Sequence, residues 1–138
     1  MKNGFKSKVA LFLVALFVLG AISVSGIMLN AVETPENRVN RISGKNRFET
    51  AVAISQEGWN ISEYVVLARG DEFADALAGV PLAYSLDAPI LLTRSNGLPA
   101  STKQEIIDLK ARNVIILGGE GAISKEVENS LTTMGLRV

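Results

Sequence analysis

The chain has 138 residues, a length that suits one folded domain, and 48% of them are hydrophobic, which excludes a disordered tail. It contains no cysteine and no histidine, so disulfides, thiolate or imidazole metal sites and nucleophile–histidine pairs are excluded. Lysine and arginine together number 14, as do aspartate and glutamate; without the three lysines of the N-terminal leader the difference is 11 − 14 = −3. Proteins that bind nucleic acid usually carry an excess of basic residues, and this chain is mildly acidic, so we expect no nucleic-acid partner.

The N-terminus follows the plan of a secretory signal. Lysines at positions 2, 6 and 8 precede an uninterrupted apolar run over residues 9–22. Small side chains follow at Ser23 and Ser25, where a signal peptidase would read them. We therefore predict that the chain is exported.

The leader sets the predicted division of the chain. We expect a signal peptide over residues 1–25, a polar spacer over 26–40 and a folded domain over 41–138, and cleavage after Ala31 instead of Ser25 stays open. An uncleaved membrane anchor stays open as the alternative, because the weakly polar stretch 9–29 is close to the ~20 residues that cross a bilayer. In that case the leader would be the only part of the chain in the membrane.

The exported part opens with a helix and a strand. Asn46 followed by Glu49 is typical of a capping box and predicts a helix to about Glu57. The apolar run over residues 64–68 is short and rich in β-branched side chains, which predicts a strand covered on both faces.

A second helix is predicted after this strand. Asp71 is expected to cap it, Leu86 to end it, and Pro81 to kink or break it. Its inner stripe is predicted to be Phe73, Ala76, Leu77 and Val80.

The second half repeats the alternation. Residues 89–92 predict a second strand, Ser101 with Gln104 predicts a capped helix to about Ala111, and residues 113–117 predict a third strand.

The pattern of the last residues predicts a glycine-rich turn, a last helix and a final short strand. The turn is expected over residues 118–122, the helix over 124–134 up to Gly135, and the start of a strand over 136–138. Short apolar strands that alternate with helices require right-handed crossovers and a parallel sheet. The predicted fold is a small three-layer α/β sandwich, Rossmann-like or Toprim-like, with a mainly parallel sheet.

Ligands of an open parallel sheet gather at the carboxyl ends of the strands. Three predicted loops share that edge, over residues 69–71, 93–97 and 118–121. Arg69 and Arg94 can present forked donors to phosphate or carboxylate there, and the amides of the glycine turn precede a helix N-terminus that favours anions. The edge is therefore a candidate site for a polyanion.

Less specific interpretations of the same residues stay open. The glycines of the turn lack the spacing of a nucleotide-binding fingerprint, and a tight turn explains them. Asp71 and Asp75 are spaced to share one helix face near Arg69, which favours a structural ion pair over a ligand contact. Together with Glu120 they are candidates for Mg²⁺, in an alternative function as a metal-dependent enzyme that acts on a phosphorylated substrate. We expect neither a cofactor nor a resident metal.

Several motifs in this order and spacing resemble one known family, the cell wall binding repeat type 2 family of Gram-positive surface and S-layer proteins. They are RISGKNRFETA at 41–51, ARGD at 68–71, ADALA at 74–78, APILLT at 88–93, VIILGG at 114–119 and AIS at 122–124. The resemblance covers residues 41–138.

The resemblance implies a secreted, non-catalytic α/β module that anchors a surface protein by binding an anionic secondary polymer of the cell wall. Family members carry three tandem copies about a pseudo-threefold axis, so other copies of the repeat, as a homotrimer or tandem-like assembly, are expected partners. Only one copy is present here. A stand-alone module that self-assembles, a fragment of a longer surface protein and a truncated product stay open.

The resemblance also assigns candidate ligand-binding residues by matched position. The family's Ile-Leu-Leu element, which is associated with anchoring, falls on Ile90, Leu91 and Leu92, although composition alone predicts these three as core. Its recurrent polar positions fall on Arg47, Arg69, Asp71 and Asp75. With Arg94 from the sheet edge, these residues complete the predicted set.

Overall fold

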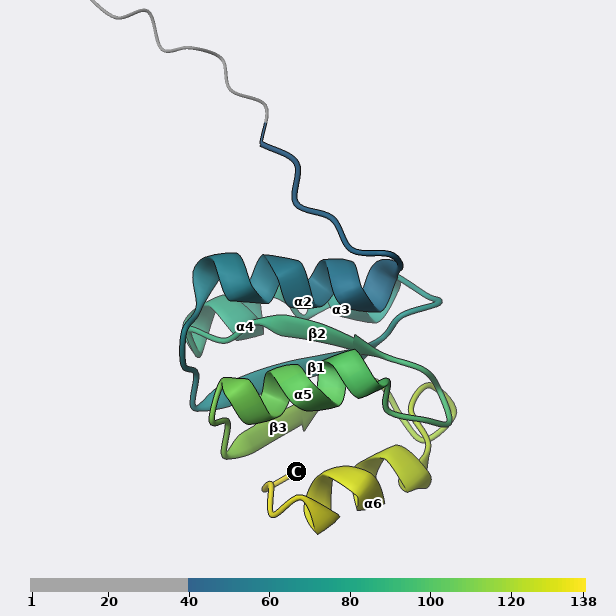
Figure 1. Ribbon diagram of the computed structural model, residues 1–138. Helices are drawn as coiled ribbons and strands as arrows, with labels where there is room; N and C mark the ends of the chain where they lie inside the picture. The colour runs from purple at the N-terminus through teal and green to yellow at the C-terminus, as the bar shows by residue number, and fades with distance from the viewer. Residues whose placement is uncertain (1–39) are drawn as a thin grey trace, which may run out of the picture. The chain divides into compact units, whose positions relative to one another are not determined.

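Three parallel strands form the centre of the protein, in the order β2-β1-β3. They are β1 (Tyr64–Arg69), β2 (Ile90–Thr93) and β3 (Asn113–Ile116), and both outer strands pair with β1 in parallel. The computed structural model shown in Figure 1 describes residues 40–138. The predicted signal peptide and nearly all of the predicted spacer lie outside the described residues, so their boundaries stay predictions.

Helices cover both faces of this sheet. One face carries α2 (Arg47–Gly58), α5 (Ala100–Asp108) and α6 (Lys125–Thr133), and the other carries α3 (Ala74–Ala78) and α4 (Val80–Ser85). In Figure 1, α5 lies in front of the sheet while α3 and α4 lie behind it. This arrangement confirms the predicted three-layer α/β sandwich.

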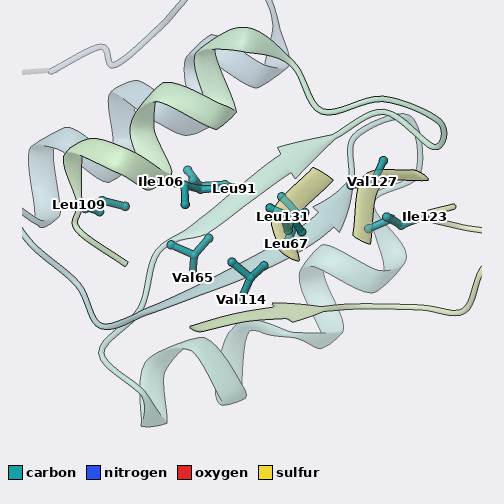
Figure 2. Packing of buried hydrophobic residues seen from close by; sticks show 9 residues of the cluster. All are labelled: Val65, Leu67, Leu91, Ile106, Leu109, Val114, Ile123, Val127 and Leu131. Atoms are coloured by element: carbon teal, nitrogen blue, oxygen red, sulfur yellow. The ribbon is translucent and has the colours of Figure 1, made fainter. Parts of the chain in front are cut away.

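The larger core lies between the sheet and the helices α5 and α6. Its nine buried residues are Val65, Leu67, Leu91, Ile106, Leu109, Val114, Ile123, Val127 and Leu131 (Figure 2). Val66, between two of these residues on β1, instead packs with Ala83 of α4 on the opposite face. Successive strand residues point to opposite faces, so the uninterrupted apolar run of β1 is what a strand covered on both sides requires.

Helix α2 begins with the predicted capping box. The Asn46 side-chain oxygen accepts hydrogen bonds from the Phe48 and Glu49 amides, both at 3.0 Å. The Glu49 carboxylate in turn accepts one from the Lys45 amide at 3.0 Å. Amide groups at the start of a helix have no intrahelical partner, so this exchange fixes where α2 begins.

The predicted helix after Asp71 is wrong in its start and in its buried face. Two short helices, α3 and α4, meet at Gly79, and Phe73 is the N-cap residue of α3, with no side-chain cap bond. Pro81 stands in the first turn of α4, where its missing N–H costs nothing. Three members of the predicted inner stripe are exposed, namely Phe73 at 81%, Leu77 at 67% and Val80 at 48%.

The second half follows the predicted order of elements, with two differences. Pro99, rather than Ser101, is the N-cap residue of α5, and no side chain caps that helix. Gly135, with φ +83°, follows the end of α6 as expected. The predicted final strand is a single parallel bridge, in which Arg137 pairs with Asn113 at the outer edge of β3.

Within residues 40–138, no helix has both the length and the apolar character needed to span a membrane.

Candidate functional site

Two arginines converge at the carboxyl edge of the sheet, near the start of α2. The Arg47 Nη1 atom donates to the carbonyl oxygen of Gly70 at 2.8 Å. The Arg94 guanidinium lies over the Phe48 ring, 5.4 Å from its centroid. Both arginines are exposed, and among the described residues neither has a salt-bridge partner. Their remaining donors are therefore open to an anion.

Glycine at position 70 allows this close arrangement. A Cβ atom there would lie 2.7 Å from Cε1 of Phe48 and 3.3 Å from the carbonyl oxygen of Thr93. Such contacts are closer than van der Waals packing allows, so a side chain would push the Phe48 ring away from the strand end. The ring that supports Arg94 depends on this glycine.

Two groups hold the turn that carries Arg94, namely the Thr93 hydroxyl and the Ser124 amide. Fully buried Thr93 has its hydroxyl 3.1 Å from the Arg94 carbonyl oxygen and 3.2 Å from that of Gly97, so one hydroxyl serves both ends of the turn. The Ser124 amide donates to the Ser95 carbonyl at 2.7 Å, which ties the turn to the start of α6. Arg94 is thus presented from a fixed backbone.

Arg69 is different, because acidic side chains already occupy its guanidinium. Its Nε donates to Asp71 Oδ1 at 2.7 Å and its Nη2 to Asp71 Oδ2 at 2.8 Å, and Glu72 lies 3.5 Å away. The hydrogen bond from Arg69 is the main cause that lowers the pKa of Asp71, and the same bond raises the pKa of Arg69. The predicted ion pair is present, but it does not cap a helix.

The glycine turn after β3 meets an acidic side chain. A Cβ atom on Gly118 would lie 2.9 Å from Oδ2 of Asp75, so this carboxylate lies directly against the turn. Glu126 and Glu128 stand in the first turn of the following helix. Lys125 holds the Glu128 carboxylate at 2.7 Å, so Asp75 and Glu126 remain as the acidic groups that oppose a polyanion at this end of the edge.

The three acidic residues predicted as metal ligands do not form a cluster. In the part of the chain from Asn40 to Val138, no three acidic side chains form a group that could hold a metal ion. Asp71 is paired with Arg69, and Asp75 lies against the glycine turn.

The Ile-Leu-Leu element divides between the core and a groove. Leu91 is fully buried and belongs to the larger core, whereas Ile90 and Leu92 are half-buried. The groove, of about 670 Å³, lies between α2 and α4 at the open edge of β2. Its main side chains are Ile54, Trp59, Val80, Tyr84, Ile90 and Leu92. Leu91 cannot contact a ligand from its buried position.

The residues that build this edge carry a family signature. Residues 41–128 match the family model of the cell wall binding domain 2 (CWB2). The chain belongs to this family.

Proteins with assigned names share the domain. The chain is 37% identical over 103 residues to N-acetylmuramoyl-L-alanine amidase LytC of Bacillus subtilis (strain 168), which covers 75% of this chain and 21% of the relative. It is 40% identical over 96 residues to the amidase enhancer of the same strain, which covers 70% and 14% respectively. This CWB2 chain therefore spans about a fifth or less of these two relatives.

Solved structures contain the same fold. Cwp6 from Clostridium difficile aligns with a TM-score of 0.66 and 36% identity, over 76% of this chain and 18% of that chain. Cwp8 from the same organism aligns with a TM-score of 0.64 and 37% identity, over 69% and 17%. These likenesses place the three-layer fold within the CWB2 family.

Sequence reasoning missed two parts of the CWB2 edge. The Phe48 ring supports Arg94, and the available signal was its position two residues after the capping residue Asn46. Buried Thr93, which holds the Arg94 turn, lies directly after the last apolar residue of β2 and gave no signal beyond that position.

Proposed function

We propose that this CWB2 chain is a non-catalytic module that lies outside the cell and attaches itself, or a protein joined to it, non-covalently to an anionic polymer of the cell wall. Membership of the family supports binding to the wall. The observation that supports an anionic ligand is the exposed pair Arg47 and Arg94, which contact Gly70 and Phe48 and form no salt bridge with another described residue.

The geometry narrows the set of contact residues. Arg47 and Arg94 are the proposed polymer contacts, because forked guanidinium donors match phosphate or carboxylate groups. Arg69 is a weaker candidate, since an incoming anion must displace Asp71 first. Asp71 and Asp75 position neighbouring groups, and Leu91 stabilises the core.

A separate surface supports the proposed contact with other copies of the domain. The groove at the β2 edge is lined by apolar side chains, and the exposed Phe73, Leu77 and Tyr84 lie on or beside α3 and α4. Side chains of this kind are expected at surfaces that associate. One copy can therefore insert the apolar side chains of α3 into the groove of the next, and a head-to-tail contact of this kind closes into a ring, such as a trimer, when its rotation allows.

The position of the domain as a small part of larger relatives supports a binding role. In LytC and the amidase enhancer the matched region is a fraction of each protein, as expected for a module joined to an effector. For this chain we infer no hydrolysis of the wall, because a sequence without histidine or cysteine cannot form the usual nucleophile–base pairs.

Co-sedimentation with isolated walls tests the proposal. The exported protein should sediment with intact walls and remain in solution when the anionic polymer has been stripped from them. A chelator should leave binding unchanged, whereas a metal-dependent enzyme would lose its activity. Binding that survives removal of the anionic polymer would refute the proposed ligand.

A further inference from the structure

The turn that carries Arg94 ends in an exposed Asn-Gly pair. Residues 94–97 form a tight turn closed by an antiparallel bridge between Arg94 and Gly97. Asn96 at its tip is exposed, and a Cβ atom on Gly97 would meet nothing within 4 Å. Gly97 therefore places no side chain beside its backbone nitrogen, and the space that a side chain would fill is open.

We propose that Asn96 is a site of spontaneous deamidation that neutralises the Arg94 turn. The Gly97 nitrogen, after losing its proton to base, attacks the side-chain amide carbon of Asn96. A new carbon–nitrogen bond forms and ammonia leaves with the transferred proton, which gives a cyclic imide. Water then opens the imide to aspartate or isoaspartate. The sum of the reaction is amide plus water to carboxylate plus ammonium, and no oxidant or cofactor takes part.

No other asparagine of residues 40–138 precedes a glycine, which makes each a poorer candidate for the same reaction. Asn60 is followed by Ile61 and Asn113 by Val114, whose β-branched side chains crowd the attacking nitrogen. Asn113 is also buried, and its side chain is directed to the Glu63 carbonyl at 3.4 Å. Asn96 combines exposure with a glycine neighbour.

The anchors of the turn leave its tip free to react. Thr93 holds the carbonyls at both ends of the turn, and the Ser124 amide holds Ser95. Among residues 40–138, no hydrogen bond or salt bridge holds the Asn96 side chain. The bridge at Gly97 has to open for the attack, but the sheet below it does not. We expect deamidation in the folded protein to be slower than in an unfolded chain, yet measurable.

The charge change falls beside the proposed polymer contact. Each event adds one negative charge two residues from Arg94, so the net charge of residues 94–97 changes from +1 to zero. An anionic polymer then meets a neutral turn. This consequence rests on the proposed function, whereas the deamidation itself does not.

Peptide mapping by mass spectrometry tests the modification. The folded protein is kept at 37 °C and mildly alkaline pH and sampled over days, because base drives the attack. We expect the peptide that contains Asn96 to gain the mass of an amide-to-acid conversion, while those with Asn60 and Asn113 stay unchanged. Gly97→Ala should slow the gain. Asn3, which also precedes a glycine, is resolved in a separate peptide. An intact Asn96 in the folded protein, when a urea-unfolded sample deamidates there, overturns the proposal.

Two variants test the consequence for binding. Asn96→Asp should sediment less with walls than the unmodified protein, and the charge-neutral Asn96→Gln should match it. Equal retention of both variants on walls would overturn the proposed effect of deamidation on wall binding. Whether Asn96 deamidates is decided separately, by the peptide mapping. If the unmodified protein does not bind walls, only the proposed function is refuted, because the mass gain at Asn96 is measured without walls.

Discussion

Arg69 and Asp71 form a two-point pair at the carboxyl end of β1, with Nε to Oδ1 at 2.7 Å and Nη2 to Oδ2 at 2.8 Å. The two residues are separated only by Gly70, whose carbonyl accepts a hydrogen bond from Arg47. One short segment therefore neutralises one arginine and positions another. This difference decides which arginines of the edge can meet an anion.

The pair predicts a shifted titration of Asp71. The pKa of its carboxyl is lowered in the folded protein, chiefly by the hydrogen bond from Arg69. A lowered folded pKa means that the pair stabilises the fold above the unfolded value of about 3.9, and that this stabilisation is lost as the pH falls through the lower folded value. In an NMR titration, Asp71 should have a lower midpoint in the unmodified protein than in Arg69→Gln. Equal midpoints would contradict the role of Arg69.

The divided Ile-Leu-Leu element predicts unequal losses of stability. Leu91 is fully buried, so Leu91→Ala should lower the free energy of unfolding by about 2–5 kcal/mol. Leu92 is only half-buried and lines the groove, so Leu92→Ala should cost less. Urea unfolding monitored by circular dichroism measures both. If Leu92→Ala lowered the free energy of unfolding more than Leu91→Ala, the assignment of Leu91 to the core and Leu92 to the groove would be wrong.

A left-handed residue at the end of α5 predicts a stabilising substitution. Lys110 has φ +56°, and a non-glycine residue in this region carries strain that glycine relieves. Lys110→Gly should raise the free energy of unfolding by about 0.5–1 kcal/mol. Lys103→Gly, inside α5, is the matched control and should lower it by about 1 kcal/mol. Thermal unfolding distinguishes the two, and destabilisation by Lys110→Gly would show that its side chain is needed.

Local signals predicted most of the fold because the elements here are strongly patterned. The run of β1 is apolar because Val65 and Val66 face opposite cores, and the cap at Asn46 is a contact between near neighbours. Asp71 was misassigned as a cap because a nearer arginine competes for its carboxylate. Helical spacing placed Phe73 inside, but the break at Gly79 leaves a five-residue helix that buries none of its residues.

The candidate site was harder to predict than the fold. Arg69 and Arg94 look equivalent in the sequence, since each follows an apolar strand. Their difference depends on tertiary contacts, with Asp71 on one and the Phe48 ring under the other. The groove depends on the spacing between α2 and α4, which no local pattern encodes.

The apolar face beside the groove predicts how copies associate. Phe73 and Leu77 are exposed at 81% and 67%, so Phe73→Asp and Leu77→Asp should leave the free energy of unfolding nearly unchanged. Both should abolish association, because a charge cannot enter an apolar groove without a partner. Light scattering gives the mass of each protein in solution. Ile107→Asp, which alters an exposed apolar residue of α5, is the matched control and should associate like the unmodified protein.

The last prediction ranks the arginines in wall binding. Arg94 lies over Phe48 without an acidic partner among the described residues, whereas Arg69 is held by Asp71. Removal of Arg94 deletes a free charge. Removal of Arg69 deletes no free donor, because Asp71 already holds its guanidinium, and the carboxylate left behind is exposed and screened by salt. Arg94→Ala should therefore weaken wall binding by up to about tenfold, the equivalent of 1.4 kcal/mol, and Arg69→Ala should weaken it less.

Salt dependence checks the same ranking independently. Exposed charges are screened over about 8 Å at physiological ionic strength, so retention on walls should fall as salt rises. The slope should be shallower in Arg94→Ala, which has one anion contact fewer, than in Arg69→Ala. Co-sedimentation across a salt series, with circular dichroism to confirm folding, gives both comparisons. Equal losses and equal slopes for the two variants would show that the pair with Asp71 opens on binding, and that both arginines contact the polymer.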